Sequence, residues 1–63
     1  MAVEKLLRTE DVANLLGVPA KTLEMWRYRG TGPRFVKLGR LVRYVESDLD
    51  EWVRSGTRTN TAE

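Results

Sequence analysis

The 63-residue sequence predicts a small, mainly α-helical domain that carries one β-hairpin. Apolar residues recur at helical spacing in three segments, and the first two segments are joined by a very short turn. Two short β-favouring runs lie between the second and third segments. Two helices joined by so short a turn cross at a steep angle as a helix-turn-helix, and the hairpin adds a wing. The predicted architecture is therefore a winged helix-turn-helix of three helices and two strands.

The first helix is predicted over residues 10–16. Thr9 precedes it and can cap its free backbone N–H groups, and the acidic residues that follow suit the positive end of the helix dipole. Gly17 supplies a residue that can end the helix in the left-handed conformation. Three residues at i, i+3 and i+4 form its apolar stripe: Val12, Leu15 and Leu16.

The second helix is predicted from about Ala20 to Arg29, between Pro19 and the turn-forming segment 30–33. Helical spacing of 100° per residue places Leu23 and Trp26 on its buried side. In a helix-turn-helix this second helix lies in the DNA major groove, so its outward residues are candidate DNA contacts. The outward face consists of Lys21, Glu24, Met25 and Tyr28, and the residues at its borders, from which long side chains could reach phosphates, are Thr22, Arg27 and Arg29.

Three residues on the outward face have alternative interpretations. Met25 could contact a thymine methyl group or fill the space between the second helix and the wing. Tyr28 could donate a hydrogen bond to a phosphate or cover the edge of the domain. Glu24 could accept a hydrogen bond from a cytosine amine or pair with a neighbour on its own helix. Trp26 and Trp52 could stack on bases, but their places on apolar stripes favour core packing.

The wing is predicted as two strands, Arg34–Lys37 and Arg40–Tyr44, joined by a tight turn at Leu38-Gly39. This pairing places Phe35 opposite Val42 on the face that covers the core. It also opposes like charges, Arg34 with Arg43 and Lys37 with Arg40, which is unfavourable unless an anion lies nearby. The four basic residues are therefore candidate phosphate contacts.

The third helix is predicted over residues 47–55, with acidic residues in its first turns and Gly56 at its end. Its apolar stripe consists of Leu49, Trp52 and Val53, which is typical of a packing helix. The carboxylates at its start could be read as a magnesium site, but their position at a helix N-terminus already explains them. The domain is expected to span residues 1–56, followed by a disordered tail over residues 57–63.

Composition excludes several kinds of chemistry. The chain has no cysteine and no histidine, so it has no disulfides, no Cys/His metal site and no nucleophile of the Ser-His or Cys-His kind. No apolar run approaches the roughly 18 residues of a membrane span, and the N-terminus does not resemble a secretory signal. We therefore expect a non-catalytic protein without metal or cofactor, located in the cytoplasm.

The positive charge is concentrated in the middle of the chain. Residues 20–44 carry seven Lys and Arg against one Glu, a net charge of +6, although the whole chain has a net charge of only +2. The flanking segments, residues 1–19 and 45–63, have net charges of −1 and −3. A solvated basic face is the ordinary explanation of such residues, but this concentration favours a polyanionic partner.

The segment LRTEDVANLLGVPAKTLEMWRYRGTGPRFVKLGRLVRYVESDLDEW, residues 7–52, resembles the excisionase-type winged-helix DNA-binding module, a relative of the DNA-binding domain of MerR-type regulators. The combination of Thr22-Leu23 and Trp26 with GPRFVKLGRLVRY and an acidic third-helix start carries the resemblance. It implies that the second helix enters the major groove and that the hairpin tip, residues 37–40, reaches an adjacent minor groove.

The resemblance implies a phage excisionase, or recombination directionality factor. Such a protein binds double-stranded attachment-site DNA cooperatively with neighbouring protomers, bends it and directs an integrase toward excision, at the nucleoid of a bacterial host. Two alternatives are a small MerR-like transcriptional regulator and a protein-only adaptor that uses the wing as an interaction edge.

The chain ends about ten residues beyond Trp52, without the long helix and effector region of MerR-type regulators, so no small-molecule effector is expected. Leu41 stands where such chains often carry a basic residue, and it could face a neighbouring protomer.

Overall fold

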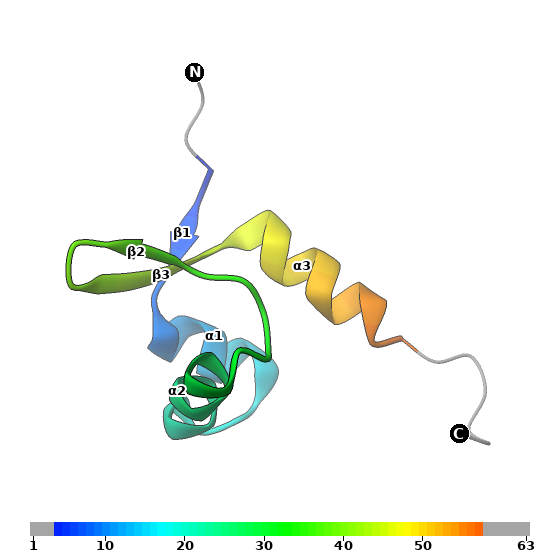
Figure 1. Ribbon diagram of the computed structural model, residues 1–63. Coiled ribbons are helices and arrows are strands. Elements are labelled where there is room, and N and C mark those ends of the chain that lie inside the picture. Colours follow the sequence, from blue (N-terminus) through cyan, green and yellow to red (C-terminus); the bar gives the residue numbers. More distant parts are fainter. Residues whose placement is uncertain (1–3, 58–63) are drawn as a thin grey trace.

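The computed structural model describes residues 4–57 and arranges them as three helices and one three-stranded antiparallel sheet (Figure 1). This confirms the predicted fold class. No helix within residues 4–57 is long and apolar enough to cross a membrane. In chain order the elements are β1 (Leu6–Leu7), α1 (Thr9–Leu16), α2 (Ala20–Arg29), β2 (Val36–Leu38), β3 (Leu41–Val45) and α3 (Glu46–Ser55).

The helices agree closely with the sequence prediction. α2 has the predicted bounds, and α1 and α3 each begin one residue earlier than expected. The early start of α1 makes Arg8 the N-cap residue, so the prediction that Thr9 caps this helix is wrong. Instead the Arg8 backbone N–H donates a 3.0 Å hydrogen bond to Asp11 Oδ2. Of the predicted tail, Thr57 is exposed, and residues 58–63 lie outside the described part of the chain.

The strand β1 was not predicted. It pairs with β3 in the order β1-β3-β2, with Leu6 opposite Val45 and Leu7 opposite Tyr44. The backbone N–H of Glu46 extends this pairing by donating a 3.1 Å hydrogen bond to the Lys5 carbonyl. Because β3 is hydrogen-bonded on both sides, the base of the wing is anchored to the N-terminal segment.

The predicted register of the hairpin is wrong by two residues. Val36 pairs with Arg43, Lys37 with Val42 and Leu38 with Leu41, so the two-residue turn is Gly39-Arg40 and not Leu38-Gly39. Among the described residues only glycines have positive φ, and Gly39 has φ 66°. A residue with positive φ at the first turn position followed by one with negative φ at the second is the pattern of a type II′ hairpin turn. The turn therefore forms where glycine can occupy its first position.

The predicted faces of the hairpin are nevertheless correct. A shift of the pairing by two residues leaves every side chain on its original face, because successive side chains alternate. Tyr44 is buried and Val42 is half-buried on the face that covers the core. The opposite, outer face carries Val36 and Leu38 of β2 and Leu41, Arg43 and Val45 of β3, and Lys37 shares the inner face with Val42.

The core lies where α1, α2 and α3 meet the inner face of the sheet. Leu15 is not part of the core: it is 66% exposed, so its assignment to the buried stripe of α1 is wrong. Val12, Ala13 and Leu16 form the inward arc of this short helix, and Leu15 falls to one side of that arc. The buried residues of the core are Leu7, Val12, Ala13, Leu23, Tyr44 and Leu49.

Gly32 allows the loop after α2 to pass close to Trp26. A Cβ atom at this glycine would lie 2.9 Å from Trp26 Cε3, and its φ of 83° is one that other residues rarely adopt. Trp26 packs in turn against Trp52 of α3, with ring centroids 5.6 Å apart. Both tryptophans are partly buried against the core, as the sequence predicted.

Replacing Leu23 by alanine should destabilise the domain by about 2–5 kcal/mol, because the side chain is fully buried and its removal leaves a cavity. Urea unfolding followed by circular dichroism measures the change. The matched control is Leu15→Ala, which removes the same atoms from an exposed position of α1 and should change the free energy of unfolding by less than about 0.5 kcal/mol. Equal losses in both variants would contradict the assigned core.

Candidate nucleic-acid interface

The exposed face of α2 has the composition that its helical spacing predicts. Lys21, Glu24, Met25 and Tyr28 together line one shallow hollow on the protein surface. Tyr28 is 92% exposed and Met25 is 44% exposed. Met25 is thus accessible on the outward face of α2, as its helical spacing predicts. This face offers a cation, a carboxylate, a thioether and a phenol to a partner.

The border residues of α2 have three different environments. Arg29 is exposed at the end of the helix, and Thr22 is half-buried near its start. Arg27 is half-buried, and its guanidinium is directed into the protein. Its Nη1 donates a 2.7 Å hydrogen bond to the Tyr44 hydroxyl and a 3.3 Å hydrogen bond to Thr9 Oγ1.

The guanidinium of Arg27 also lies against two aromatic rings. Its central carbon is 5.7 Å from the ring centroid of Phe35 and 6.0 Å from that of Tyr44, distances at which a cation is attracted to an aromatic face. These rings belong to the loop before β2 and to β3, and Thr9 begins α1. One side chain of α2 thus contacts α1 and the base of the wing. Arg27 thereby links α2 to the base of the hairpin.

The basic residues of the wing do not oppose one another as predicted. Arg43 lies opposite Val36, Lys37 lies opposite Val42, and Arg40 lies in the turn. Opposed like charges therefore give no reason to expect an anion beside the hairpin. Lys37 and Arg40 are exposed, and Arg43 is half-buried with its Nη1 donating a 2.8 Å hydrogen bond to the Val42 carbonyl.

Arg34 lies in the loop between α2 and β2, because the strand expected to begin there begins at Val36. Its side chain is exposed and lines a hollow that also includes Asp48 and Glu51 of α3. The structure therefore places Arg34 beside acidic residues and apart from the strands of the wing.

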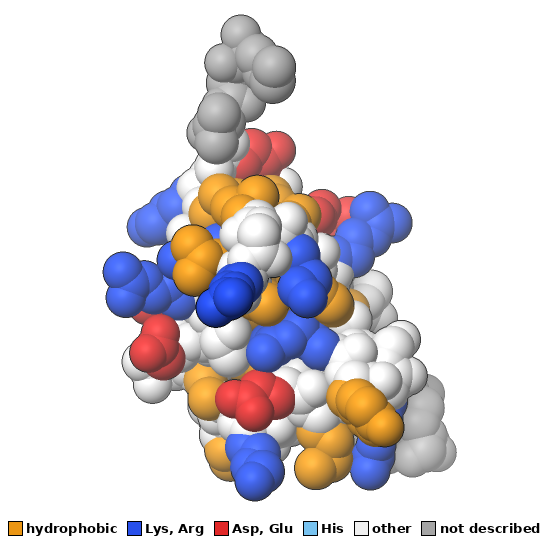
Figure 2. All heavy atoms as spheres, turned by 60° about the vertical axis from the view of Figure 1, so that its left-hand side comes forward, with side chains coloured by type: hydrophobic (Ala, Val, Ile, Leu, Met, Phe, Trp, Pro, Cys, Tyr) orange, Lys and Arg blue, Asp and Glu red, His pale blue; other side chains and the backbone are white. Residues whose placement is uncertain are grey.

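The electrostatic character of this part of the surface follows from the sequence. No acidic residue occurs between Glu24 and Glu46, so the end of α2, the loop and the hairpin carry only positive charges. Figure 2 shows Lys and Arg side chains gathered across the middle of the face toward which the hairpin points, with apolar side chains among them. A polyanion that contacted α2 and the wing together would meet predominantly positive potential there.

The acidic residues gather on α3 instead. Asp50 forms an i, i+4 salt bridge with Arg54, with an Nε to Oδ2 distance of 2.8 Å, at an exposed position. Within residues 4–57 no group of three or more acidic side chains is arranged to hold a metal ion.

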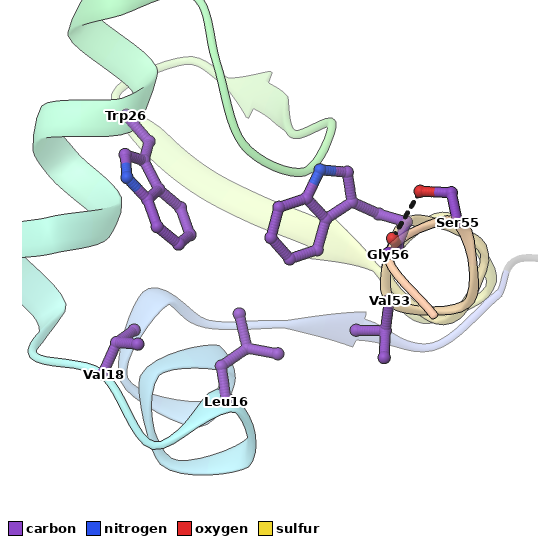
Figure 3. A pocket seen from close by; sticks show the side chains of 7 residues that line it. Leu16, Val18, Trp26, Val53, Ser55 and Gly56 are labelled. Atoms are coloured by element: carbon purple, nitrogen blue, oxygen red, sulfur yellow. Dashed lines mark hydrogen bonds between the residues drawn. The ribbon is translucent and has the colours of Figure 1, made fainter. Parts of the chain in front are cut away.

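A third concavity lies on another part of the molecule, between α2, the α1–α2 turn and the end of α3. Figure 3 shows Leu16, Val18, Trp26 and Val53 around it, with the hydrogen bond from Ser55 Oγ to the Trp52 carbonyl at its rim. Its volume is about 370 Å³, and none of its lining residues is charged. This apolar groove is therefore unsuited to phosphate, and the exposed face of α2 and the wing remain the candidate nucleic-acid interface.

Comparison with protein families agrees with this geometry. A family model described as a helix-turn-helix domain matches residues 6–57, which is most of the chain. The protein belongs to this helix-turn-helix family. The matched segment runs from β1 through α3, so the unpredicted strand β1 lies within the family domain. Membership of the helix-turn-helix family supports DNA as the partner. A comparison with curated proteins found no similar sequence.

Sequence reasoning missed the residues that orient the interface. Thr9 and Tyr44 hold Arg27, yet they lie 18 and 17 residues away from it along the chain. Helical and strand periodicity predict which face a residue occupies, and they do not predict hydrogen-bond partners between elements so far apart. A buried tyrosine whose hydroxyl needs a partner was the available signal, because buried polar groups are almost always hydrogen-bonded.

Substituting Arg27 by methionine should lower the free energy of unfolding by about 1–3 kcal/mol, because the hydroxyl of the buried Tyr44 loses its hydrogen-bond donor. Tyr44→Phe removes the other partner, and the two substitutions should be non-additive by at least about 0.5 kcal/mol in a double-mutant cycle. The control is Arg29→Met on the same helix, where the side chain is exposed and little change is expected. Additive effects of Arg27→Met and Tyr44→Phe would contradict the assigned contact.

Proposed function

We propose that this protein is a sequence-specific, non-catalytic double-stranded DNA-binding protein. In this proposal α2 lies in the major groove and the hairpin contacts the adjacent minor groove. The observation that carries it is the combination of an exposed, mixed-polarity helix face with an exposed hairpin whose charged residues are all basic. Base recognition needs varied side chains that reach base edges, and phosphate binding needs cations.

The two surfaces have different roles in this proposal. Lys21 and Met25 read base edges, the first by hydrogen bonds to guanine and the second by apolar contact with a thymine methyl group, and Glu24 accepts from a cytosine amine. The remaining contacts go to the phosphate backbone, which positions the protein without reading sequence. They comprise Thr22, Tyr28 and Arg29 of α2 and Lys37, Arg40 and Arg43 of the wing. Arg27 acts by holding α2 and the wing in register, and Arg34 is left out because of its acidic surroundings.

The biological role that we propose is that of a phage excisionase. The resemblance of residues 7–52 to excisionase-type modules supports it. A single module with one recognition helix buries a modest area on DNA, so useful occupancy calls for several protomers on adjacent sites. Neighbouring protomers would then bend the attachment site, and an integrase would cut and rejoin the DNA. Such a protein would act at the bacterial nucleoid, in the cytoplasm.

The wing should account for a measurable share of the salt dependence of DNA binding. If Lys37 and Arg40 each neutralise one phosphate, replacing both by alanine should make the log–log slope of affinity against salt shallower by about 1.8. All DNA sequences should lose affinity to a similar extent, because phosphate contacts carry no sequence information. Fluorescence anisotropy titrations over a series of salt concentrations give the slope.

The control for that experiment is Lys5→Ala/Arg54→Ala, which removes the same net charge from exposed positions outside the candidate interface. It should leave the slope within about 0.5 of the wild-type value, because neither cation is placed against a phosphate. Equal changes of slope in the two double variants would mean that only net charge matters and that the wing does not contact DNA.

The excisionase role is tested by a recombination assay. Supercoiled DNA with the two hybrid attachment sites is incubated with the phage integrase that recognises those sites, with and without this protein. We expect excision to depend on the protein, the reverse integration reaction to be inhibited, and DNA cleavage to be absent without integrase. Binding to a promoter with no effect on either recombination reaction would instead identify a small transcriptional regulator. Absence of DNA affinity even at low salt would identify a protein-only adaptor.

A further inference from the structure

The outer face of the wing is apolar near its tip. Leu38 and Leu41 are paired across the two strands on either side of the Gly39-Arg40 turn, and they are 50% and 54% exposed. Val36, on the same face, is 36% exposed. None of the three belongs to the buried core or to the side chains packed against it. Figure 1 shows the hairpin extending away from the helices, so its tip is accessible.

A role in folding alone explains this pair poorly. One face of an antiparallel hairpin normally packs on the core, and the face in contact with water is polar. A cross-strand apolar pair contributes only about 0.2–1 kcal/mol to a hairpin, which a pair of threonines can approach without exposing leucine side chains. Exposed apolar groups gathered at a projecting tip are typical of an interaction surface.

The surrounding charges identify the kind of partner. Arg40 lies in the turn between the two leucines, and Arg43 lies on their face of the hairpin, whereas Lys37 lies on the opposite face with Val42. No acidic residue occurs in the hairpin. An apolar pair with one cation in the turn and another farther along the same face fits a surface with an apolar interior and anionic borders. The DNA minor groove has this character, since sugars and base edges lie between two rows of phosphates, whereas two wings in mutual contact would bring their cations together.

We propose that Leu38 and Leu41 form an apolar wedge that enters the minor groove and unstacks a base step, while the cations beside them bind the flanking phosphates. This inference rests on the proposed DNA-binding function and assigns to two residues the bending of the site. Cross-strand Cβ atoms lie about 5 Å apart. The side chains on them fill the roughly 6 Å minor groove, so entry requires the groove to open. Opening a groove around an apolar wedge kinks the duplex.

An apolar wedge predicts a preference for easily unstacked base steps, which hydrogen-bonding contacts alone do not predict. Pyrimidine–purine steps such as TA and CA unstack more readily than other steps, so they should be favoured where the tip enters. A duplex with a mismatch at that step should bind more tightly than the matched duplex, by about tenfold, because part of the unstacking has already taken place. Neither preference depends on a base contact by α2.

The experiment compares wild type with Leu38→Ser/Leu41→Ser on a duplex of about three helical turns that contains the bound site. Energy transfer between dyes at the two ends reports bending, and 2-aminopurine at the entered step reports unstacking. The wild type should increase both signals and prefer the mismatched duplex. The variant should bind with both signals lost and with no preference for the mismatch.

Two further variants test whether bending depends on the wedge itself. Leu15→Ser/Val53→Ser removes exposed apolar side chains from α1 and α3 and should bend DNA as the wild type does. Leu38→Thr/Leu41→Thr also removes the leucines, and its β-branched residues favour the strand conformation. This variant tests the wedge if the serine variant unfolds. Circular dichroism establishes that each variant is folded.

Several results would overturn the proposal. Wild-type binding without bending or unstacking would exclude a wedge, as would unchanged signals in a folded Leu38/Leu41 variant. Loss of cooperative binding with an unchanged bend per bound protomer, seen as a lower stoichiometry in sedimentation, would assign the leucines to contact with a second copy. If the wild type binds no duplex at all, the proposed DNA-binding function itself fails, and that result is distinct from the others.

Discussion

The hydrogen bond from Arg27 to the Tyr44 hydroxyl ties the second helix to the wing, and the geometry of the candidate interface depends on it. Tyr44 is almost completely buried, so its hydroxyl requires a partner, and the 2.7 Å contact with the guanidinium supplies one. The same guanidinium reaches Thr9 and lies against Phe35. One side chain thus fixes α2 relative to the wing. The small core of the domain alone would hold these two elements less firmly.

The sheet holds Tyr44 in the position that this hydrogen bond requires. β3 carries Tyr44 and is paired on one side with β1 and on the other with β2, so the tyrosine cannot move without disturbing the sheet. The glycine at the first position of the hairpin turn sets the register and thereby determines which residues reach the tip. Separation of charge along the chain adds the electrostatic component, with cations in α2 and the wing and carboxylates on α3. The fold therefore presents one basic face although the net charge of the chain is small.

Local signals in the sequence predict the helices well. Pro19 and the turn-forming residues after Arg29 bound α2, and its spacing correctly separates the buried Leu23 from the exposed Lys21 and Met25. The faces of the hairpin also follow from alternation. The register does not, because Leu38-Gly39 and Gly39-Arg40 are both plausible two-residue turns, and the structure forms the one with glycine first.

Other features could not be predicted from local patterns. The two residues of β1 are too few to show alternation, and only the tertiary pairing with β3 makes them a strand. Leu15 has suitable spacing for a buried stripe, yet it is exposed. In a helix as short as α1, the elements packed against the helix decide which of its residues face the core. Arg27 has the sequence environment of a phosphate-binding residue, and its contacts with Thr9 and Tyr44, far away in the chain, could not be predicted from that environment. The pairing of Leu38 with Leu41 at the tip of the wing follows only from the observed register of the hairpin.

We propose that α2 and the wing form one DNA-binding surface. Amide NMR spectra recorded while the ¹⁵N-labelled protein is titrated with duplex DNA test it most directly. We expect signals from Ala20–Arg29 and from residues 36–45 to shift together at the same DNA concentration, while those of the second half of α3 change little. Shifts confined to α2 without the wing, or centred on α3 and the apolar groove beside it, would contradict the claim.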